Sequence, residues 1–367
     1  MFINQNKHTN HKFFMGLALA QAQKNLGNTK ENPSVGCVLV KNGHLITAGH
    51  TGEGGRPHAE QNAISLSKIS PKKSELYVTL EPCSHYGRTP PCVKLIIKNK
   101  IKKVFFSLND PDPRSFKKCS LTLRKKGVFV SNYILKNKIS LFYRSYIKHK
   151  KSKLPFVTCK LAASKDFYTI NKINKWITNE FSRGRVHLMR SYNECIITSS
   201  KTIINDNPRL SCRIEGLTQR SPHIIILDRK LKMPTSSKII NKLNRKRVII
   251  FYNVANKEKI KLLKKLKIKT YKISLDSTGY LDLRESLIKA KKLGFYRIFI
   301  ETGIKLTTSF FNMKLIDDFK LFISSKKLGK NGQESMKSFF GSYLKNKRKI
   351  IEKVNLFGDL LVSYKIK

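Results

Sequence analysis

The sequence predicts an α/β protein made of two consecutive domains. A chain of 367 residues is longer than most single hydrophobic cores, and 40% of its residues are hydrophobic. Segments with strand patterns alternate with segments of helical pattern on both sides of a basic, polar stretch at residues 148–154. We therefore expect one domain at residues 1–147, a linker at 148–154 and a second domain at 155–367.

The first domain is expected to begin with a helix at Asn10–Leu26. Its apolar run, Phe13–Ala20, also resembles the core of a signal peptide, but Phe14, Leu17 and Ala18 share one helical stripe, which favours a helix. The Asn42-Gly43 pair predicts a tight hairpin turn. Strands are expected at Val35–Val40, His44–Gly49, Leu76–Leu80, Val104–Leu108 and Val128–Val130, and helices at His58–Ser67, Cys92–Lys98 and Phe116–Lys126.

The second domain repeats this alternation and has no Gly-x-Gly-x-x-Gly fingerprint. Its residues alone therefore indicate only an α/β domain. Strands are expected at Phe156–Leu161, Glu194–Thr198, His223–Leu227, Arg247–Tyr252, Ile268–Ile273 and Tyr296–Glu301, helices at Glu180–Arg190 and Asp282–Leu293, and a strand pair within Lys353–Tyr364.

The charge balance is extreme, since 74 Lys and Arg against 23 Asp and Glu give a net charge of +51. Such an excess is typical of nucleic-acid-binding proteins. However, the Lys residues are spread over both halves, as expected from compositional drift. A phosphorylated small substrate would also suit a positive field. No apolar run approaches the ~18 residues of a membrane helix, and the seven cysteines are an odd number, which favours a soluble protein with reduced thiols in the cytoplasm.

The most informative pattern is His58-Ala59-Glu60, followed by Cys83 after a predicted strand and Cys92 at the start of a predicted helix. One imidazole and two thiolates can hold zinc and leave a fourth position open for water, whose pKa zinc lowers towards neutrality. Glu60 is too close to His58 to be an equivalent ligand, but it is well placed to move protons. This arrangement is typical of zinc deaminases.

The two cysteines are separated by eight residues, whereas nucleoside and nucleic-acid deaminases usually have two between them. The segment Thr79–Cys92, read with Asn32–Val38 and the Asp110-Pro111-Asp112-Pro113 turn, closely resembles the bifunctional deaminase/reductase family of riboflavin biosynthesis. This resemblance implies a cytidine-deaminase-like α/β/α domain followed by a dihydrofolate-reductase-like α/β domain.

For the first domain the resemblance implies hydrolytic deamination of a diaminohydroxy-phosphoribosylaminopyrimidine. His58, Cys83 and Cys92 would bind one Zn²⁺, and Glu60 would be catalytic. Asn32 and the Ser84–Arg88 loop would line the pyrimidine and phosphate side. One departure concerns the segment after Pro113, where the family usually has Gly-x-Gly and Arg114–Ser120 contains no glycine.

For the second domain the resemblance implies reduction of the ribosyl chain to ribityl with NADPH. The signposts are Lys160–Ser164, Trp176–Thr178, Thr198–Thr202, Asp206–Leu210 and Glu301–Gly303. The implied cofactor-binding residues are Ala162, Trp176, Thr202, Asp206 and Gly303, and the implied substrate-binding residues are Asn174, Arg190, Leu210, Arg213 and Glu301.

This half also departs from the family pattern. A Leu-Asp-Gly-Arg turn is replaced by Lys165-Asp166-Phe167-Tyr168, the loop before Trp176 is shortened, and Thr302 and Lys305 replace glycines. Two alternatives to a bifunctional enzyme therefore stay open, a monofunctional deaminase with a degenerate second domain and a nucleic-acid deaminase. The family analogy further implies a homo-oligomer, with no specific nucleic-acid partner and no membrane.

Overall fold

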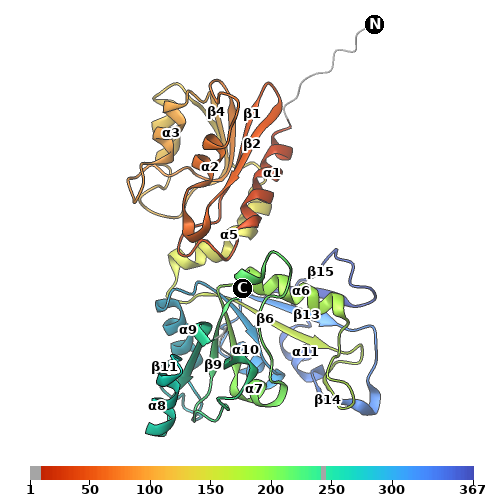
Figure 1. Cartoon of the computed structure of the whole chain (residues 1–367). Helices are drawn as coiled ribbons and strands as arrows, with labels where there is room; N and C mark the ends of the chain where they lie inside the picture. Colours follow the sequence, from red (N-terminus) through yellow and green to blue (C-terminus); the bar gives the residue numbers. More distant parts are fainter. Residues whose placement is uncertain (1–9, 241–244) are drawn as a thin grey trace. The chain divides into compact units, whose positions relative to one another are not determined.

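The computed structural model describes residues 10–240 and 245–367 (Figure 1). The chain divides into two compact units, Met1–Ser152 and Lys153–Lys367. Both are mixed α/β, as predicted. Among the described residues, no helix is both long and apolar enough to cross a bilayer. The first nine residues of the predicted first domain lie outside the described part.

The first unit is built on a five-stranded sheet in the order β2-β1-β3-β4-β5, in which β3, β4 and β5 are parallel and β1 is antiparallel to both neighbours. Its strands are β1 (Gly36–Lys41), β2 (His44–His50), β3 (Glu75–Leu80), β4 (Lys103–Leu108) and β5 (Phe129–Ser131). Its α-helices are α1 (His11–Lys24), α2 (Ala59–Ser65), α3 (Cys92–Lys98), α4 (Lys118–Arg124) and α5 (Lys136–Lys151).

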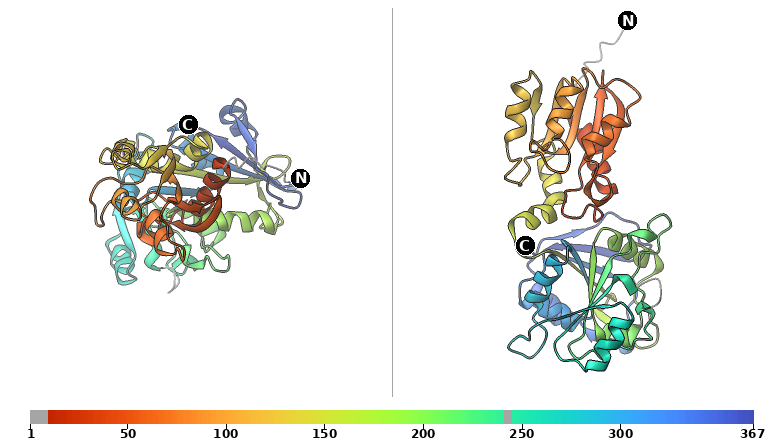
Figure 2. Two further views of the ribbon diagram at one scale, coloured as in Figure 1. Left: turned by 90° about the horizontal axis from the view of Figure 1, so that it is seen from above. Right: turned by 60° about the vertical axis from the view of Figure 1, so that its left-hand side comes forward.

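Helices cover both faces of this sheet (Figures 1 and 2). On one face, Phe14 of α1 packs on Tyr77 and the Tyr143 hydroxyl of α5 lies 2.6 Å from the Thr79 hydroxyl. Tyr77 and Thr79 are two apart in β3 and so project from the same face. The approach of α1 requires Gly36, because a Cβ atom there would clash with the Ala18 carbonyl oxygen. The helices α2 and α3 contact each other, as do α3 and α4.

The second unit is built on a nine-stranded sheet in the order β11-β10-β9-β8-β12-β6-β13-β16-β15. The first seven of these strands are parallel, and β16 is antiparallel to both β13 and β15. The strands are β6 (Phe156–Ala163), β8 (Cys195–Ser199), β9 (His223–Leu227), β10 (Val248–Tyr252), β11 (Lys269–Lys272), β12 (Arg297–Glu301), β13 (Asp318–Ile323), β15 (Lys349–Ile351) and β16 (Leu360–Lys365).

The helices of the second unit connect these strands, and two hydrophobic clusters hold helices against the sheet. A separate two-stranded ribbon pairs β7 (Tyr168–Asn171) with β14 (Gly332–Ser335). The α-helices are α6 (Glu180–Ser191), α7 (Ser200–Asp206), α8 (Lys257–Lys265), α9 (Leu283–Lys292), α10 (Ile304–Asn312) and α11 (Lys337–Tyr343).

Three differences from the sequence-based expectations stand out. The expected linker at 148–154 is wrong in its first half, since α5 runs to Lys151 with Ile139, Tyr143 and Tyr146 buried. The strand pair expected within Lys353–Tyr364 instead joins β16 to β15, which lies upstream of that range. The ribbon β7–β14, the strand β13 (Asp318–Ile323) and the helices α5, α7, α8, α10 and α11 have no counterpart in the expectations. Of these helices, α7 and α11 have only seven residues each, too few for a helical period to stand out.

Candidate active sites

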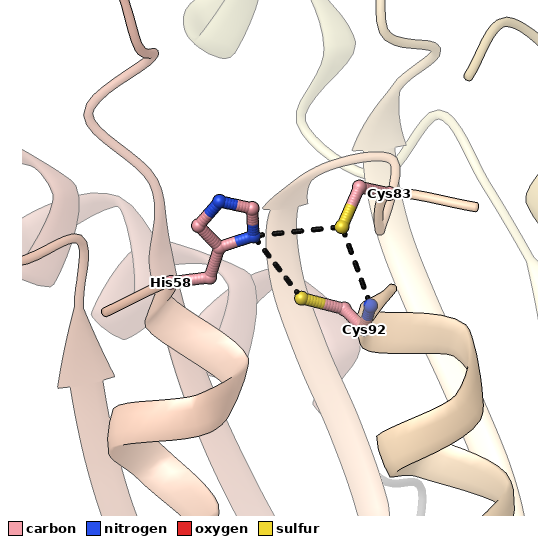
Figure 3. Close-up of side chains that lie close together, drawn as sticks. All are labelled: His58, Cys83 and Cys92. Atoms are coloured by element: carbon pink, nitrogen blue, oxygen red, sulfur yellow. Dashed lines mark hydrogen bonds between the residues drawn. The ribbon is translucent and has the colours of Figure 1, made fainter. Parts of the chain in front are cut away.

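His58, Cys83 and Cys92 converge at the ends of three elements of the first unit (Figure 3). His58 is the N-cap of α2, Cys83 lies in the loop after β3, and Cys92 is the first residue of α3. His58 Nδ1 lies 3.2 Å from Cys92 Sγ and 3.5 Å from Cys83 Sγ, and all candidate ligand atoms lie within 4.8 Å of one another. The predicted ligand set is thus brought together by the fold.

The donors of this cluster fit zinc. One imidazole nitrogen and two sulfurs are the ligands of a catalytic zinc site with an open fourth position. Hydrogen bonds from Cys92 and His58 lower the pKa of Cys83 to about 4 and so favour its thiolate, the form that binds metals, whereas the same contact and burial raise the pKa of Cys92. The chemistry of the donor set and its close spacing therefore both match the metal.

Glu60 lies in the first turn of α2, two residues after His58, and is 3% exposed. Burial raises the pKa of its carboxyl group to about 7, against the opposing charge of His58. A carboxyl group that titrates near neutrality can both accept and donate a proton under physiological conditions. The position of Glu60 beside the metal ligands therefore suits a general acid and base.

Glu81 is a residue of this site that the sequence analysis missed. It directly follows β3, two residues before Cys83, and is 3% exposed. Its Oε2 accepts hydrogen bonds from the backbone N–H groups of Asp110 (3.1 Å) and Lys117 (3.0 Å), and its Oε1 accepts one from Cys119 (3.1 Å). One buried carboxylate thus ties the end of β3 to the 110–119 loop. In the sequence, Glu81 could have been identified by its position in the Glu81-Pro82-Cys83 segment, two residues before a predicted metal ligand.

The same loop is held at a second point, where His85 Nδ1 lies 2.8 Å from the hydroxyl of the buried Ser115. Within the loop, Lys117 adopts a left-handed conformation with φ 58°. It lies in the stretch where the resembling family has Gly-x-Gly. Without a glycine, the backbone at Lys117 is strained, but the loop keeps its hydrogen bonds to Glu81.

The second unit contains a cleft of about 1620 Å³. It lies where the parallel strands β6, β8, β9 and β12 end, because Ala162, Ser199, Leu227 and Glu301 all line it. Ligands of open α/β sheets bind at this carboxyl edge. Of the ten predicted residues of this half, nine line the cleft: Ala162, Trp176, Arg190, Thr202, Asp206, Leu210, Arg213, Glu301 and Gly303. The tenth, Asn174, is exposed and does not line it.

Arg190 and Glu301 form a buried, bidentate ion pair in this cleft. Arg190 Nε donates to Glu301 Oε1 at 2.6 Å and Nη2 donates to Oε2 at 2.9 Å, while Nη1 donates to the Ser211 carbonyl at 3.0 Å. The side chains are 12% and 10% exposed. The guanidinium of Arg190 therefore donates its hydrogen bonds to groups of the protein and orients Glu301. Arg213, which also lines the cleft, has no carboxylate partner of this kind among the described residues.

Lys160 is a second charged residue that the sequence analysis left without a role. It is paired with Glu301 in the register of β6 and β12, and it lines the cleft. Burial lowers the pKa of its ammonium group, and the Glu301 carboxylate opposes that shift. A Lys next to a carboxylate at a strand end is typical of a proton-transfer or substrate-binding site.

Residues at the start of α10 fit the phosphate groups of a dinucleotide. Gly303 is the N-cap and has no side chain to satisfy the first-turn N–H groups. The Thr302 hydroxyl is buried and has no hydrogen-bond partner within the described part of the chain. Free N–H groups at a helix N-terminus bind anions. This end of the cleft thus offers NADPH a matching surface, and Lys305 adds a positive charge.

One residue of the cleft, Trp176, and one residue outside its lining, Phe167, bear on the sequence-based expectations. Trp176 is 57% exposed and lies 4.9 Å from the Arg183 guanidinium, so it is a cleft residue and not part of the core. Phe167, in the place of the family's turn glycine, adopts φ 68°. The position therefore does require a left-handed backbone, and the chain keeps the turn with Phe.

Comparisons with known proteins match both units. Residues 8–108 match the model described as "Cytidine and deoxycytidylate deaminase zinc-binding region", and residues 155–354 match that described as "RibD C-terminal domain". The riboflavin biosynthesis protein RibD of Chlamydia trachomatis is 34% identical over 89% of this chain and 87% of its own length. That of Aquifex aeolicus is 33% identical over 96% of this chain and 98% of its own length.

Solved structures match the whole chain as well. RibD of Acinetobacter baumannii (form 1) superposes with a TM-score of 0.82 at 28% identity, covering 97% of this chain and 99% of that one. The diaminohydroxyphosphoribosylaminopyrimidine deaminase/5-amino-6-(5-phosphoribosylamino)uracil reductase of Thermotoga maritima gives a TM-score of 0.80, 28% identity and the same coverage. Zinc and NADPH are the cofactors that the two domains imply. The chain belongs to the RibD family of riboflavin biosynthesis, which joins a deaminase to a reductase.

Proposed function

We propose that this chain catalyses two successive reactions on one phosphorylated pyrimidine. The first hydrolyses an amino group of diaminohydroxy-phosphoribosylaminopyrimidine and releases ammonia. The second reduces the ribosyl chain of 5-amino-6-(5-phosphoribosylamino)uracil to ribityl. The observation that carries the proposal is the convergence of His58, Cys83 and Cys92 beside the buried Glu60.

In the deamination, His58, Cys83 and Cys92 would hold zinc, which would supply the Lewis acidity for activating water. Glu60 accepts a proton from the attacking water and delivers it to the departing amine. Water and the C–NH₂ group are thereby converted into a carbonyl and ammonia. Glu81 keeps the 110–119 loop closed beside the site through its three backbone contacts.

In the reduction, the cleft would hold NADPH, which would provide the hydride needed to reduce the first carbon of the ring-opened sugar. The first turn of α10 and Thr302 would hold the phosphate groups of the cofactor, and Ala162, Trp176, Thr202 and Asp206 would line the rest of its site in the cleft. Glu301, oriented by Arg190, binds sugar hydroxyls, and Lys160 lies beside it as a proton donor. Arg213 is suited to the substrate phosphate, because a guanidinium binds phosphate bidentately.

The proposal also covers the binding partners, the cellular location and the oligomeric state of the protein. The substrate is a small molecule, with neither a specific nucleic acid nor a membrane as partner, and the +51 charge reflects composition. All seven cysteines lie within the described residues and are free thiols, which supports a cytoplasmic location. Association into a homo-oligomer rests on family analogy.

A second candidate function is deamination alone. It is favoured by the left-handed backbone of Phe167 and by Thr302 and Lys305, which replace family glycines after Glu301. Ammonia release separates deamination from every non-deaminase interpretation. The zinc-loaded chain, given the diaminopyrimidine without NADPH, should release one ammonia per substrate, and a chelator should abolish release until zinc is restored. Correctly folded, zinc-loaded protein that releases no ammonia would refute the proposal.

A further inference from the structure

His187 is a cleft residue to which the reactions above give no role. It lies on α6 three residues before Arg190, so the two side chains share a face of the helix. It lines the cleft and is 9% exposed. Arg190 Nη1 lies 3.3 Å from its Nδ1 atom. The ring therefore forms part of the same polar wall as the Arg190–Glu301 pair.

The hydrogen bonds of His187 fix which ring nitrogen carries the proton. Nδ1 lies 2.8 Å from the Ser211 carbonyl oxygen. A carbonyl oxygen only accepts, so Nδ1 must donate. The same oxygen accepts from Arg190 Nη1 at 3.0 Å, using its second lone pair. In the neutral ring, Nε2 is therefore unprotonated and is an acceptor.

Burial and, after it, the surrounding charges favour the neutral ring. Burial lowers the pKa of His187 to about 4, and the charges of Arg190 and Arg213 act in the same direction, against weaker opposite effects of the hydrogen bond to Ser211 and of Glu301. Across the part of the chain that the structure describes, no side chain or backbone group is hydrogen-bonded to Nε2. The cleft thus contains an unused, uncharged acceptor.

We propose that His187 Nε2 accepts a hydrogen bond from a hydroxyl group of the substrate's phosphorylated sugar. Among the polar side chains of this wall, Lys160 and Arg213 only donate, and Glu301 has one lone pair of each oxygen taken up by Arg190, so His187 Nε2 adds a second acceptor beside Glu301. A sugar chain brings several O–H donors. The inference rests on the reductase function proposed above and adds a determinant of its substrate affinity.

The test uses two substitutions that separate the two ring nitrogens. In His187→Asn, the amide N–H can replace Nδ1 as donor to Ser211, but nothing reaches the position of Nε2. In His187→Gln, the longer amide reaches that position. His223→Asn is the matched control, because His223 lies in the same domain and packs on Phe295 without lining the cleft. Binding of the deaminated substrate and of NADPH is measured by calorimetry on the full chain, together with steady-state reduction.

His187→Asn should weaken substrate binding and raise KM about tenfold, the effect of one lost hydrogen bond. NADPH affinity and the melting temperature should stay unchanged, and His187→Gln should recover substrate affinity to within about threefold of wild type. Unchanged substrate affinity in His187→Asn, or an equal loss of NADPH affinity, would overturn the inference. If the wild type binds the substrate without oxidising NADPH, the reductase function fails, but the affinities still decide the role of His187. If it does not bind the substrate, both fail.

Discussion

The two active sites differ in how their residues are distributed along the chain. The metal ligands and Glu60 all lie between His58 and Cys92, at element ends whose boundaries the sequence marks. The reductase cleft gathers residues from Lys160 to Glu334. A site made of short neighbouring segments can be recognised from its chemistry alone, whereas a cleft assembled from many strand ends is recognised only through its fold.

The two sites also hold their buried carboxylates differently. Glu81 is satisfied by three backbone N–H groups, so its surroundings need no particular side chain. Glu301 is satisfied by Arg190, and each charge depends on the other. The deaminase loop can therefore tolerate sequence change around Glu81, while a change at Arg190 or Glu301 should damage the reductase directly.

The largest expected effect separates the two sites completely. Glu60→Gln removes the proton carrier, and ammonia release should fall by about 10²- to 10⁴-fold. Reduction of the deaminated substrate should stay within twofold of wild type, since Glu60 belongs to the other unit. Zinc content is measured in the same samples. Ammonia release above a tenth of the wild-type rate would contradict the role of Glu60.

Glu301→Gln should destabilise the second unit by about 3–5 kcal/mol, because Arg190 keeps a buried charge without its partner. Reduction should be lost. Calorimetry should show a lower melting temperature for the second unit and an unchanged transition for the first. Glu75→Gln, at the more exposed ion pair with Lys103 in the first unit, is the control and should cost no more than about 1 kcal/mol. Equal losses of stability in Glu301→Gln and Glu75→Gln would contradict the difference expected between the buried and the more exposed ion pair.

Glu81→Gln tests the backbone-held carboxylate. The amide keeps one acceptor oxygen but turns an NH₂ group towards a backbone donor, so the first unit should lose about 1–3 kcal/mol. Because the 110–119 loop loosens, KM for the diaminopyrimidine should rise while zinc content stays at one per chain. Urea unfolding and metal analysis measure the two effects. A loss of zinc without a change in KM would show that Glu81 positions the metal ligands and not the 110–119 loop.

The smallest effects come from the two left-handed residues, one in each unit. Lys117→Gly should stabilise the first unit by about 0.5–1 kcal/mol, because its side chain is exposed and glycine removes the strain. Phe167→Gly relieves the same strain but loses packing against Phe340, so the second unit should be destabilised by about 1 kcal/mol. Opposite signs in urea unfolding are expected, and a gain at both positions would contradict this explanation.

The sequence was sufficient for the metal centre, because the ligand types, their order and the strand and helix ends around them all agree. It was also sufficient for most strands of both sheets, but it missed the longest helix, α5, and the strand β13. It missed Glu81, Lys160 and His187, whose roles depend on partners far along the chain, such as Cys119, Glu301 and Ser211. It also missed that Arg190 binds Glu301, because the spacing of two residues 111 apart carries no geometric signal.

We infer that both halves are active enzymes in spite of their unequal resemblance to the family pattern. The most direct test supplies the wild-type chain with the pre-deaminated substrate and NADPH, and follows absorbance at the nicotinamide band. Oxidation of one NADPH per substrate, with formation of the ribityl product, is the predicted result. Ammonia release from the diaminopyrimidine without any NADPH oxidation on the deaminated substrate would contradict the claim and leave a monofunctional deaminase.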